Sequence, residues 1–211
     1  MIIDAISDLH GHIPELQGGD LLIVGGDLTA SNKPEQYDKF ISWLQNQSYQ
    51  RIIVIAGNHD MMLQNDECLP LGDYDGRNIE YLCDSGTKFQ GLKIWGSPWS
   101  LWFPQINPHC SAYTSDDYLM KEFYDLIPDD TDILITHTPA YGILDRNKNN
   151  HYCGSISLRR ALTRVKPKHH FFGHIHEMGG KGIDLTITKC YNCSIMDENY
   201  KPSNKVTRVI I

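Results

Sequence analysis

The stretch that decides the fold is Ile52-Ile53-Val54-Ile55-Ala56-Gly57-Asn58-His59-Asp60. Its apolar, β-branched first half predicts a buried strand, which Gly57 ends. Polar groups that can bind a ligand follow at once, in residues 58–60. Such a junction is typical of layered α/β proteins, whose ligand sites lie beyond the carboxyl ends of the strands.

Four other short segments place Asp or His directly after an apolar run in the same way. They are Asp8-Leu9-His10, Gly26-Asp27, Thr136-His137-Thr138 and Gly173-His174-Ile175-His176. The runs before them, 2–7, 21–24, 133–136 and 170–172, are predicted strands. Because the ends of such strands converge on one crevice, we expect these polar side chains to lie together.

The remaining segments alternate between helix and strand patterns. We expect helices over 34–47, over 114–127 with Thr114 or Ser115 as the N-cap, and over 155–165. Strands are expected over 92–95, 182–188, 191–196 and 206–211, and a loop with at most short strands over 64–86. This order of elements predicts one α/β domain over residues 1–211, with helices on the outside of the sheets.

The composition excludes several classes of protein. With 41% hydrophobic and 10% aromatic residues, the 211-residue chain can bury a core and is not expected to be disordered. A formal charge of −7 argues against the basic face that duplex nucleic acid requires. No apolar run approaches the roughly 18 residues that a membrane helix needs, so we expect no membrane partner.

The amino terminus carries no basic region before its first acidic residue, so it does not have the pattern of a signal peptide. Six cysteines in a chain of this length do not make a disulfide scaffold, and we expect reduced thiols and a cytoplasmic protein. Cys190 and Cys193 have zinc-knuckle spacing, but no second pair accompanies them, which favours two thiols on a strand. Trp99, Trp102 and Phe103 follow a Ser-Pro turn and either stack on a base or pack within a surface loop.

The five polar segments together supply carboxylate, imidazole and amide groups and need no thiolate. This set of donors suits Mn²⁺, Fe, Co²⁺ or Zn²⁺ rather than Ca²⁺ or Cu. Any single Asp or His of this kind is more often a cap, a turn residue or a surface group. A joint pattern of such groups at successive strand ends, by contrast, points to a metal site.

These residues, in this order, resemble the motif blocks of the calcineurin-like metallophosphoesterase superfamily: D-x-H, G-D, G-N-H-[DE], a single His after a strand, and G-H-x-H. The match runs from Asp8 to His176. The resemblance implies a four-layer α/β/β/α sandwich with two divalent metal ions between the strand-end loops of the two central sheets. Mn²⁺ is the first choice for these ions, with Fe, Zn²⁺, Co²⁺ and Ni²⁺ as alternatives.

Position by position, the resemblance implies a role for eight residues. One metal is held by Asp8, His10 and His176, the other by Asn58, His137 and His174, and Asp27 bridges the two. Two ions roughly 3.5–4 Å apart need such a bridging carboxylate, and they share a hydroxide that attacks phosphorus in line. His59, free of metal, is then the general acid for the leaving oxygen, and Asn58 can hydrogen-bond the phosphoryl group.

A narrower resemblance, to the metallophosphoesterase-domain-containing (MPPED-type) branch, lies in residues 95–99 (WGSPW), 136–145 (THTPAYGILD) and 173–177 (GHIHE). That branch is similar to class III cyclic-nucleotide phosphodiesterases, which implies hydrolysis of a cyclic phosphodiester. The G-D-x-V-D-R-G block of protein Ser/Thr phosphatases is missing, and Gly26-Asp27-Leu28-Thr29-Ala30 stands there instead. That difference counts against a phosphoprotein phosphatase.

The sequence therefore predicts a dinuclear metal-dependent phosphodiesterase that acts on a small phosphodiester or nucleotide, with a cyclic nucleotide as the first candidate. Two alternatives stay open: a phosphomonoesterase or nuclease of the same superfamily, and a non-catalytic protein that binds metal and nucleotide. A homodimer also stays open. The sequence does not separate 2′,3′- from 3′,5′-cyclic substrates.

Overall fold

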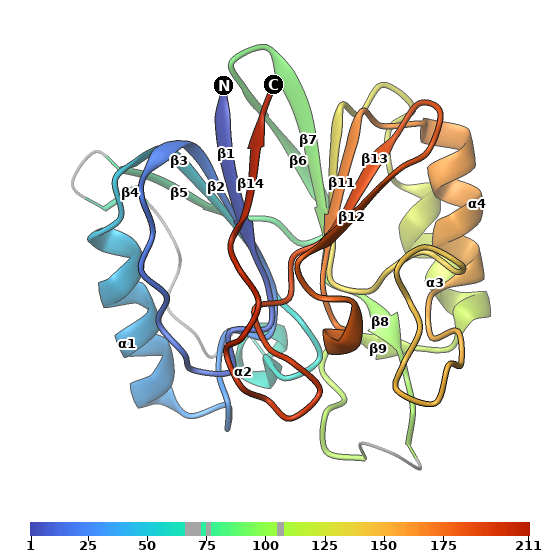
Figure 1. Ribbon diagram of the computed structural model, residues 1–211, viewed down its shortest axis with the longest axis horizontal. Coiled ribbons are helices and arrows are strands. Elements are labelled where there is room, and N and C mark those ends of the chain that lie inside the picture. Colours follow the sequence, from blue (N-terminus) through green and yellow to red (C-terminus); the bar gives the residue numbers. More distant parts are fainter. Residues whose placement is uncertain (66–72, 75–76, 105–107) are drawn as a thin grey trace.

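The chain folds into two six-stranded sheets that face each other (Figure 1). The structure, a computed structural model, describes residues 1–65, 73–74, 77–104 and 108–211. The first sheet has the order β14 (Thr207–Ile210), β1 (Ile2–Ile6), β2 (Gly19–Gly25), β3 (Tyr49–Ile55), β5 (Arg77–Tyr81) and β4 (Asp73–Tyr74). The second has the order β12 (Lys181–Asp184), β13 (Lys189–Asn192), β11 (His169–Phe172), β10 (Ile133–Thr136), β7 (Leu92–Ser97) and β6 (Ser85–Phe89). In each sheet the inner strands run parallel, and the two edge strands are antiparallel to their neighbours.

Helices cover the outer faces of both sheets. In Figure 1, α1 (Pro34–Gln45) lies against the first sheet, and α3 (Asp117–Asp125) and α4 (Ile156–Val165) lie against the second. The short elements are α2 (Met61–Gln64), the 3₁₀ turn η1 (His176–Met178) and the pair β8 (Ser100–Leu101) and β9 (Thr114–Ser115). The predicted α/β/β/α arrangement is confirmed.

Three apolar clusters hold these four layers together, and β3 shows how one strand serves two of them. Ile52 and Val54 pack in a cluster with Phe40 of α1, whereas Ile53 and Ile55 belong to the cluster between the sheets. A third cluster lies between the second sheet and the helices α3 and α4. Because both faces of β3 are buried, its sequence is a continuous apolar run rather than an alternating one.

Helix boundaries follow local capping chemistry. The predicted helix over 155–165 is confirmed as α4, whose N-cap Ser155 accepts a hydrogen bond from the N–H of Leu158. For α3 the predicted cap is wrong: Thr114 and Ser115 form β9, and Asp116 caps the helix instead. A carboxylate at this position satisfies a free N–H and favours the positive end of the helix dipole.

Some strand predictions are also corrected. The segment 64–86, expected as a loop with at most short strands, holds the last residue of α2, the short strands β4 and β5 and the start of β6. The unpredicted β6 pairs with β7 although none of its residues is buried. The strand expected over 182–188 ends at Asp184, and the one expected over 191–196 coincides with β13 only at residues 191–192. Residues 66–72 and 75–76, Cys68 among them, lie outside the described part of the chain. None of the helices in the described ranges has the length and apolar character to span a bilayer.

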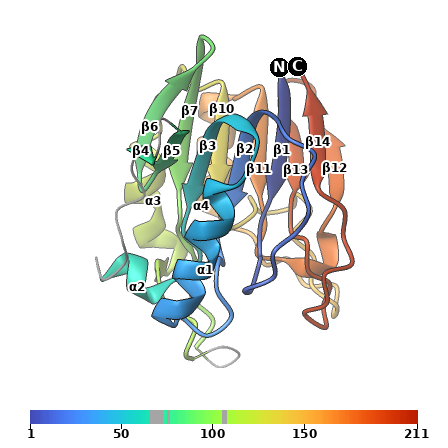
Figure 2. The same ribbon diagram turned by 90° about the vertical axis from the view of Figure 1, so that its left-hand side faces the viewer.

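The topology gathers the functional loops at one end of the molecule. The two chain termini lie side by side at the opposite end, where β1 and β14 pair (Figure 2). The loops that follow β1, β2, β3, β10 and β11 all leave the sheets at the other end (Figure 1). These are the five junctions at which the sequence predicts ligand-binding groups.

Candidate metal centre

The five strand-end loops bring the predicted ligand groups into one cluster. Donor atoms form three overlapping groups, and within each group they lie within 4.8 Å of one another. The groups are Asp8 with His10 and His176, His10 with Asp27 and His59, and Asp8 with Asp27 and His137. Because each group shares a member with the others, they form one continuous set of donors that draws on both sheets.

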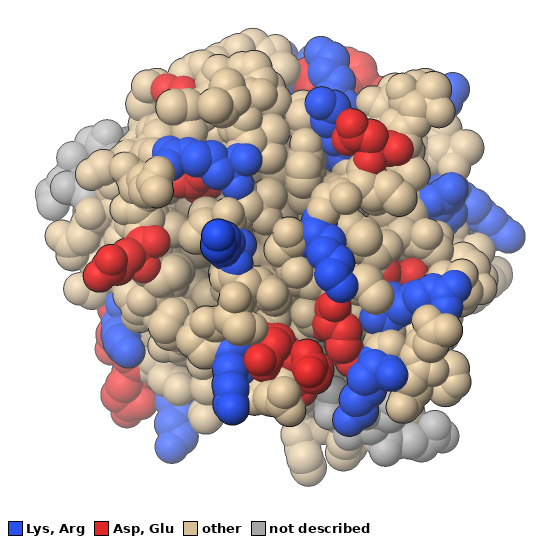
Figure 3. Space-filling model, viewed as in Figure 1, with Lys and Arg blue, Asp and Glu red and all other residues tan. Residues whose placement is uncertain are grey.

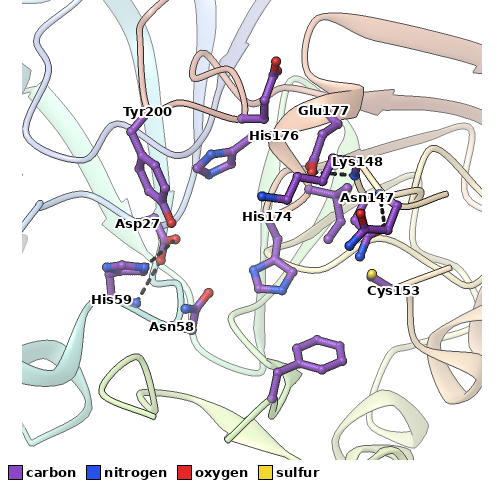
Figure 4. Close-up of a pocket in the computed structure, with 14 residues that line it drawn as sticks. Asp27, Asn58, His59, Asn147, Lys148, Cys153, His174, His176, Glu177 and Tyr200 are labelled. Atoms are coloured by element: carbon purple, nitrogen blue, oxygen red, sulfur yellow. Dashed lines mark hydrogen bonds and ion pairs between the residues drawn. The ribbon is translucent and has the colours of Figure 1, made fainter. Parts of the chain in front are cut away.

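The carboxylate of Asp27 lies at the centre of this set. Its Oδ2 is 3.4 Å from Nε2 of His137, 3.7 Å from Nε2 of His10 and 4.0 Å from Nε2 of His59. Its Oδ1 accepts the backbone N–H of His59 at 2.9 Å (Figure 4). One buried carboxylate therefore faces three imidazoles, which is the position that a bridging ligand occupies.

Hydrogen bonds on the far side of two rings leave one nitrogen of each facing the cluster. Nδ1 of His137 lies 2.9 Å from the carbonyl oxygen of Gly25, and Nδ1 of His176 lies 3.2 Å from that of Asp197. A carbonyl only accepts, so each Nδ1 carries the proton and donates it. In the neutral form of each ring, the lone pair on Nε2 then faces Asp27 or Asp8, as in histidines whose tautomer is set for metal binding.

Asp8 joins the strand-end loops of the two sheets. Both of its carboxylate oxygens accept the backbone N–H of His174, at 3.1 and 3.0 Å. Its Oδ1 also lies 3.5 Å from Nε2 of His176, and that nitrogen is 3.4 Å from Nε2 of His10. Two ring nitrogens this close beside a carboxylate converge on one point, as the predicted first set of ligands requires.

The residues of the predicted second set lie next to one another, although His174 belongs to none of the three donor groups. Oδ1 of Asn58 lies 3.0 Å from Nε2 of His137, and the ring of His174 packs edge-on against His137 with centroids 5.1 Å apart. His137 in addition joins Asp8 and Asp27, so the two predicted sets overlap in space. Which of these atoms bind a metal stays a prediction.

The backbone at the site is held in an uncommon conformation. Asp8, His10, Asp27 and His174 all have positive φ angles, between 43° and 68°. A left-handed conformation costs about 1 kcal/mol or more for a residue with a side chain, and such residues concentrate at functional sites. Here it turns the chain sharply after β1, β2 and β11 and points the side chains into the cluster.

Two further residues hold the loops against each other. Asp60, which is fully buried, accepts the backbone N–H of Gly57 at 2.8 Å and that of Leu28 at 3.1 Å. A Cβ at Gly57 would lie 2.3 Å from Oδ1 of Asp27, so only glycine lets this carboxylate sit against the loop. Asp60 therefore orients the loops that carry Asp27 and Asn58.

Charge in the site matches the needs of a cation. Burial alone raises the pKa of Asp8, but the hydrogen bond and charge of His176 outweigh it and lower this pKa to about 2. The facing imidazoles likewise hold the pKa of Asp27 well below its usual value, against the effect of burial. Burial lowers the pKa of His10 to about 4 and that of His174 to about 3. Ionised carboxylates and neutral imidazoles are the forms that bind metal ions.

The Asp27 carboxylate favours the protonated, positively charged forms of His137 and His59. Burial lowers the pKa of each ring, but the Asp27 carboxylate outweighs burial and raises both to about 9. At His137, a proposed ligand, a divalent cation beside Asp27 would supply the charge that the ring proton supplies, and it would displace that proton. The set of oxygen and nitrogen donors, the fixed tautomers and this charge balance all fit a metal centre.

The cluster forms one wall of a pocket of about 330 Å³ (Figure 4). Asp27, Asn58, His59, His174 and His176 line it on the metal side. Ile175 and Glu177 line it beside the two last histidines, and the other lining residues come from other loops: Phe103, residues 147–149, Cys153, Glu198 and Tyr200.

The pocket lining bears on one open interpretation and includes Tyr200, which the sequence did not indicate. Among the three aromatic residues considered for base stacking, Phe103 lines the pocket, whereas Trp99 stacks on Phe123 at 3.8 Å. Tyr200 was not predicted, although its ring lies 4.9 Å from the rings of both His10 and His176. It stands in no motif and no strong hydrophobic pattern, so no local signal marks it.

The paired cysteines have a structural role. Cys190 is buried in the apolar cluster under α4, and Cys193 in the cluster between the sheets. They therefore lie on opposite faces of the second sheet and cannot share a zinc ion. The prediction of two strand thiols is confirmed for Cys190; Cys193 lies one residue beyond β13.

Comparison with known proteins agrees with this geometry. Residues 1–178 match the family model described as calcineurin-like phosphoesterase. The chain is 34% identical to the human protein named metallophosphoesterase domain-containing protein 1, over 94% of this chain and 67% of that protein. It is 33% identical to UPF0046 protein K07C11.7 of Caenorhabditis elegans, over 83% of this chain and 63% of the relative.

Solved structures support the fold. TT1561 of Thermus thermophilus superposes with a TM-score of 0.65 at 15% identity, covering 99% of this chain and 97% of that one. GAP50, described as the anchor in the inner membrane complex of Plasmodium, superposes with a TM-score of 0.54 at 11% identity, covering 100% of this chain and 77% of GAP50. With the matched family model, the sequence relatives and the Asp and His cluster taken together, this chain belongs to the calcineurin-like phosphoesterase family.

Proposed function

We propose that this protein is a dinuclear metal-dependent phosphodiesterase that hydrolyses a small phosphodiester, with cyclic nucleotides as the first substrate class to test. Membership of the family supports phosphoester hydrolysis. The observation that carries the proposal is the central position of Asp27, whose carboxylate joins a donor group containing His10 to another containing His137. A single carboxylate shared by two donor groups is what two neighbouring cations require.

The proposed ligands follow from this arrangement. Asp8, His10 and His176 would hold one cation, Asn58, His137 and His174 the other, and Asp27 would contact both. When bound, the cations supply Lewis acidity, which lowers the pKa of water and neutralises charge on the phosphoryl oxygens. The protein's part is to hold these donors rigidly, through the buried hydrogen bonds and the strained strand ends described above.

His59 is the proposed proton donor to the leaving oxygen. Its side chain is 17% exposed and lines the pocket, whereas those of His10 and His137 are 6% and 0% exposed. Its backbone N–H is fixed on Asp27, and its Nδ1 lies 3.8 Å from Sγ of Cys110. The ring therefore stands at the edge of the donor cluster and lines the pocket, which is where a general acid has to lie.

The size and charge of the site favour a small substrate. A pocket of about 330 Å³ is at the lower end of the range for small-molecule sites. On the face in Figure 3, Lys and Arg of the described residues alternate with Asp and Glu and do not gather into a basic groove. A nucleic acid polymer needs such a groove, and the described pocket lining holds one Lys and no Arg, so a mononucleotide or similar diester fits better.

The test is hydrolysis by protein reconstituted with Mn²⁺, and in parallel with Fe²⁺, Co²⁺, Ni²⁺ and Zn²⁺. We expect release of p-nitrophenol from bis(p-nitrophenyl) phosphate, lost in Asp27→Ala and reduced at least about 100-fold in His59→Ala. His12→Ala is the matched control, since the described hydrogen bond of His12 is made by its backbone and the residue does not line the pocket. Inactivity of wild-type protein with every metal on mono- and diesters would overturn the proposal.

Substrate comparison separates the proposal from its rivals. Higher kcat/KM on cyclic mononucleotides than on nucleoside monophosphates supports a phosphodiesterase, and the reverse order indicates a phosphomonoesterase. Preference for single-stranded oligonucleotides indicates a nuclease. Tight binding of metal and nucleotide without product indicates a non-catalytic binding protein.

A further inference from the structure

The loop between β10 and α4 forms a rigid arm over the pocket. Oδ2 of the buried Asp145 accepts the backbone N–H groups of Gly142 and Gly154, both at 3.0 Å. The two sides of the arm are joined by hydrogen bonds from the N–H of Cys153 to the carbonyl of Asp145 and from the N–H of Asn147 to that of His151. These bonds close the base and the middle of the arm, which restricts the positions that its tip can take.

The tip of the arm is ordered in the same way. The side-chain oxygen of Asn147 accepts the backbone N–H groups of Asn149 and His151, both at 3.0 Å. The backbone N–H of Lys148 donates to Oε1 of Glu177 at 2.7 Å. Glu177 directly follows His176, so the backbone of Lys148 is tied to the segment that carries a proposed metal ligand.

The side chain of Lys148 extends from this tip into the pocket. Figure 4 shows it directed away from the arm, toward His174 and His176. Within the described part of the chain, its ammonium group makes no hydrogen bond or ion pair, although Glu177 is adjacent: that carboxylate accepts the backbone N–H instead. By contrast, the ammonium of Lys181, close by in sequence, donates to the carbonyl of Glu177 at 2.9 Å.

Lys148 also stands out by its charge. Among the described residues that line the pocket it is the only Lys or Arg, and it shares the pocket with Asp27, Glu177 and Glu198. An ammonium group held over a site for anions, and left without a partner of its own, is a ready hydrogen-bond donor for an anionic ligand.

We propose that Lys148 is a substrate-binding residue that donates to a phosphate oxygen of the substrate from the side of the pocket opposite the proposed general acid. This inference rests on the proposed function and adds to it a contact outside the metal ligands. The phosphate is either the one that is cleaved or a second phosphate on the same nucleotide. Because the ammonium is on a flexible stem, its contribution falls mainly on binding and hence on KM rather than on kcat.

The test compares Lys148→Met, which keeps length and removes charge, with Lys148→Arg and with Lys189→Met, a control on β13 outside the pocket lining. We expect Lys148→Met to lower kcat/KM about tenfold, chiefly through KM, with Lys148→Arg close to wild type. Metal content and Tm should not change in any variant. Kinetics of Lys148→Met within about twofold of wild type and of the control would overturn the inference.

A comparison of two substrates shows which phosphate Lys148 contacts. A nucleoside 2′,3′-cyclic phosphate is compared with the same compound bearing an additional 5′-phosphate. An equal loss on both assigns Lys148 to the phosphate that is cleaved, and a loss confined to the second compound assigns it to the additional one. No loss on either overturns the inference.

A binding measurement separates this inference from the proposed function. Inorganic phosphate is titrated into Mn²⁺-loaded wild-type and Lys148→Met protein by calorimetry. Weaker phosphate binding by Lys148→Met supports the role of Lys148 even if wild-type protein hydrolyses no diester, in which case the proposed function alone fails. Equal phosphate affinity of the two proteins, together with equal kinetics on both cyclic substrates, overturns the role of Lys148 even if hydrolysis is observed.

Discussion

Substitution of Gly173 by alanine tests whether the position of Asp8 matters as the geometry indicates. Gly173 stands between β11 and His174, and its φ is not in the left-handed region, so its backbone accepts alanine. An added Cβ, however, would lie 2.2 Å from Oδ2 of Asp8 and 2.1 Å from Oγ of Ser7. Real Cβ contacts are essentially never shorter than 3.0 Å, so something must move.

The size of the movement sets the expected effect. Restoring a 3.0 Å contact displaces the Asp8 carboxylate or the β11 loop by about 0.8 Å, and a shift near 1 Å can cost about 10²-fold in rate. Overpacking of this kind also destabilises a fold by about 1–3 kcal/mol. We therefore expect Gly173→Ala to lose about 10²-fold in kcat/KM and a large part of its bound Mn²⁺, while remaining folded.

The assay combines hydrolysis of bis(p-nitrophenyl) phosphate, metal content by mass spectrometry and urea denaturation. Gly91→Ala is the control: its φ of +83° makes alanine costly, but nothing lies within 4 Å of the added Cβ. It should lose about 1 kcal/mol of stability and no activity. A Gly173→Ala protein with full metal content and wild-type kcat/KM would refute the reasoning.

Four further outcomes are expected. Asp27→Asn keeps the shape of the side chain and removes its charge, so the affinity for Mn²⁺ in a calorimetric titration should fall by about 10-fold to 100-fold or more. Unchanged affinity would contradict the central position of Asp27 in the metal site. Mn²⁺ at 100 times its Kd should stabilise the folded protein by about 2.7 kcal/mol, so removal of the metal with EDTA should lower Tm. Equal Tm values with and without EDTA would argue against an ion bound to the native state. Burial lowers the pKa of His170 to about 3, so the unfolded chain, with its ordinary histidine pKa of 6.5, binds the proton more readily as pH falls below about 6.5. The free energy of unfolding should therefore drop by about 2 kcal/mol from His170 alone between pH 7 and pH 5, and urea curves of His170→Leu should lack that part of the pH dependence. Ser155→Ala removes the N-cap of α4 and should cost about 1–2 kcal/mol, with Ser155→Thr near wild type; no loss in the alanine variant would mean that the cap is dispensable.

Strands with two buried faces could be predicted from the sequence. The prediction for 133–136 coincides with β10, and the apolar run that ends at Gly57 lies within β3 and the residue after it. Their hydrophobic side chains alone mark them, because both faces exclude water. β6 could not be found in this way, since it is an edge strand without a buried residue and exists through its hydrogen bonds to β7.

The metal-side residues were also accessible to sequence reasoning, because each follows a strand and belongs to a motif. The local sequence pattern shows which side chains follow the end of a strand, and the carboxyl ends of parallel strands lie at the same edge of their sheet. It does not say how one sheet packs on the other, so the approach of His137 to both Asp8 and Asp27 was not predicted.

What the sequence by itself determined is the layered α/β architecture and the set of strand-end Asp, Asn and His residues, since both depend on local hydrophobic periodicity and chain turns. The tertiary structure alone decided the opposite wall of the pocket. Lys148 and Tyr200 reach it from loops with no motif and no apolar pattern. Their place depends on long-range hydrogen bonds and packing, such as the contact of Lys148 with Glu177, and these are interactions that no local pattern of residues encodes.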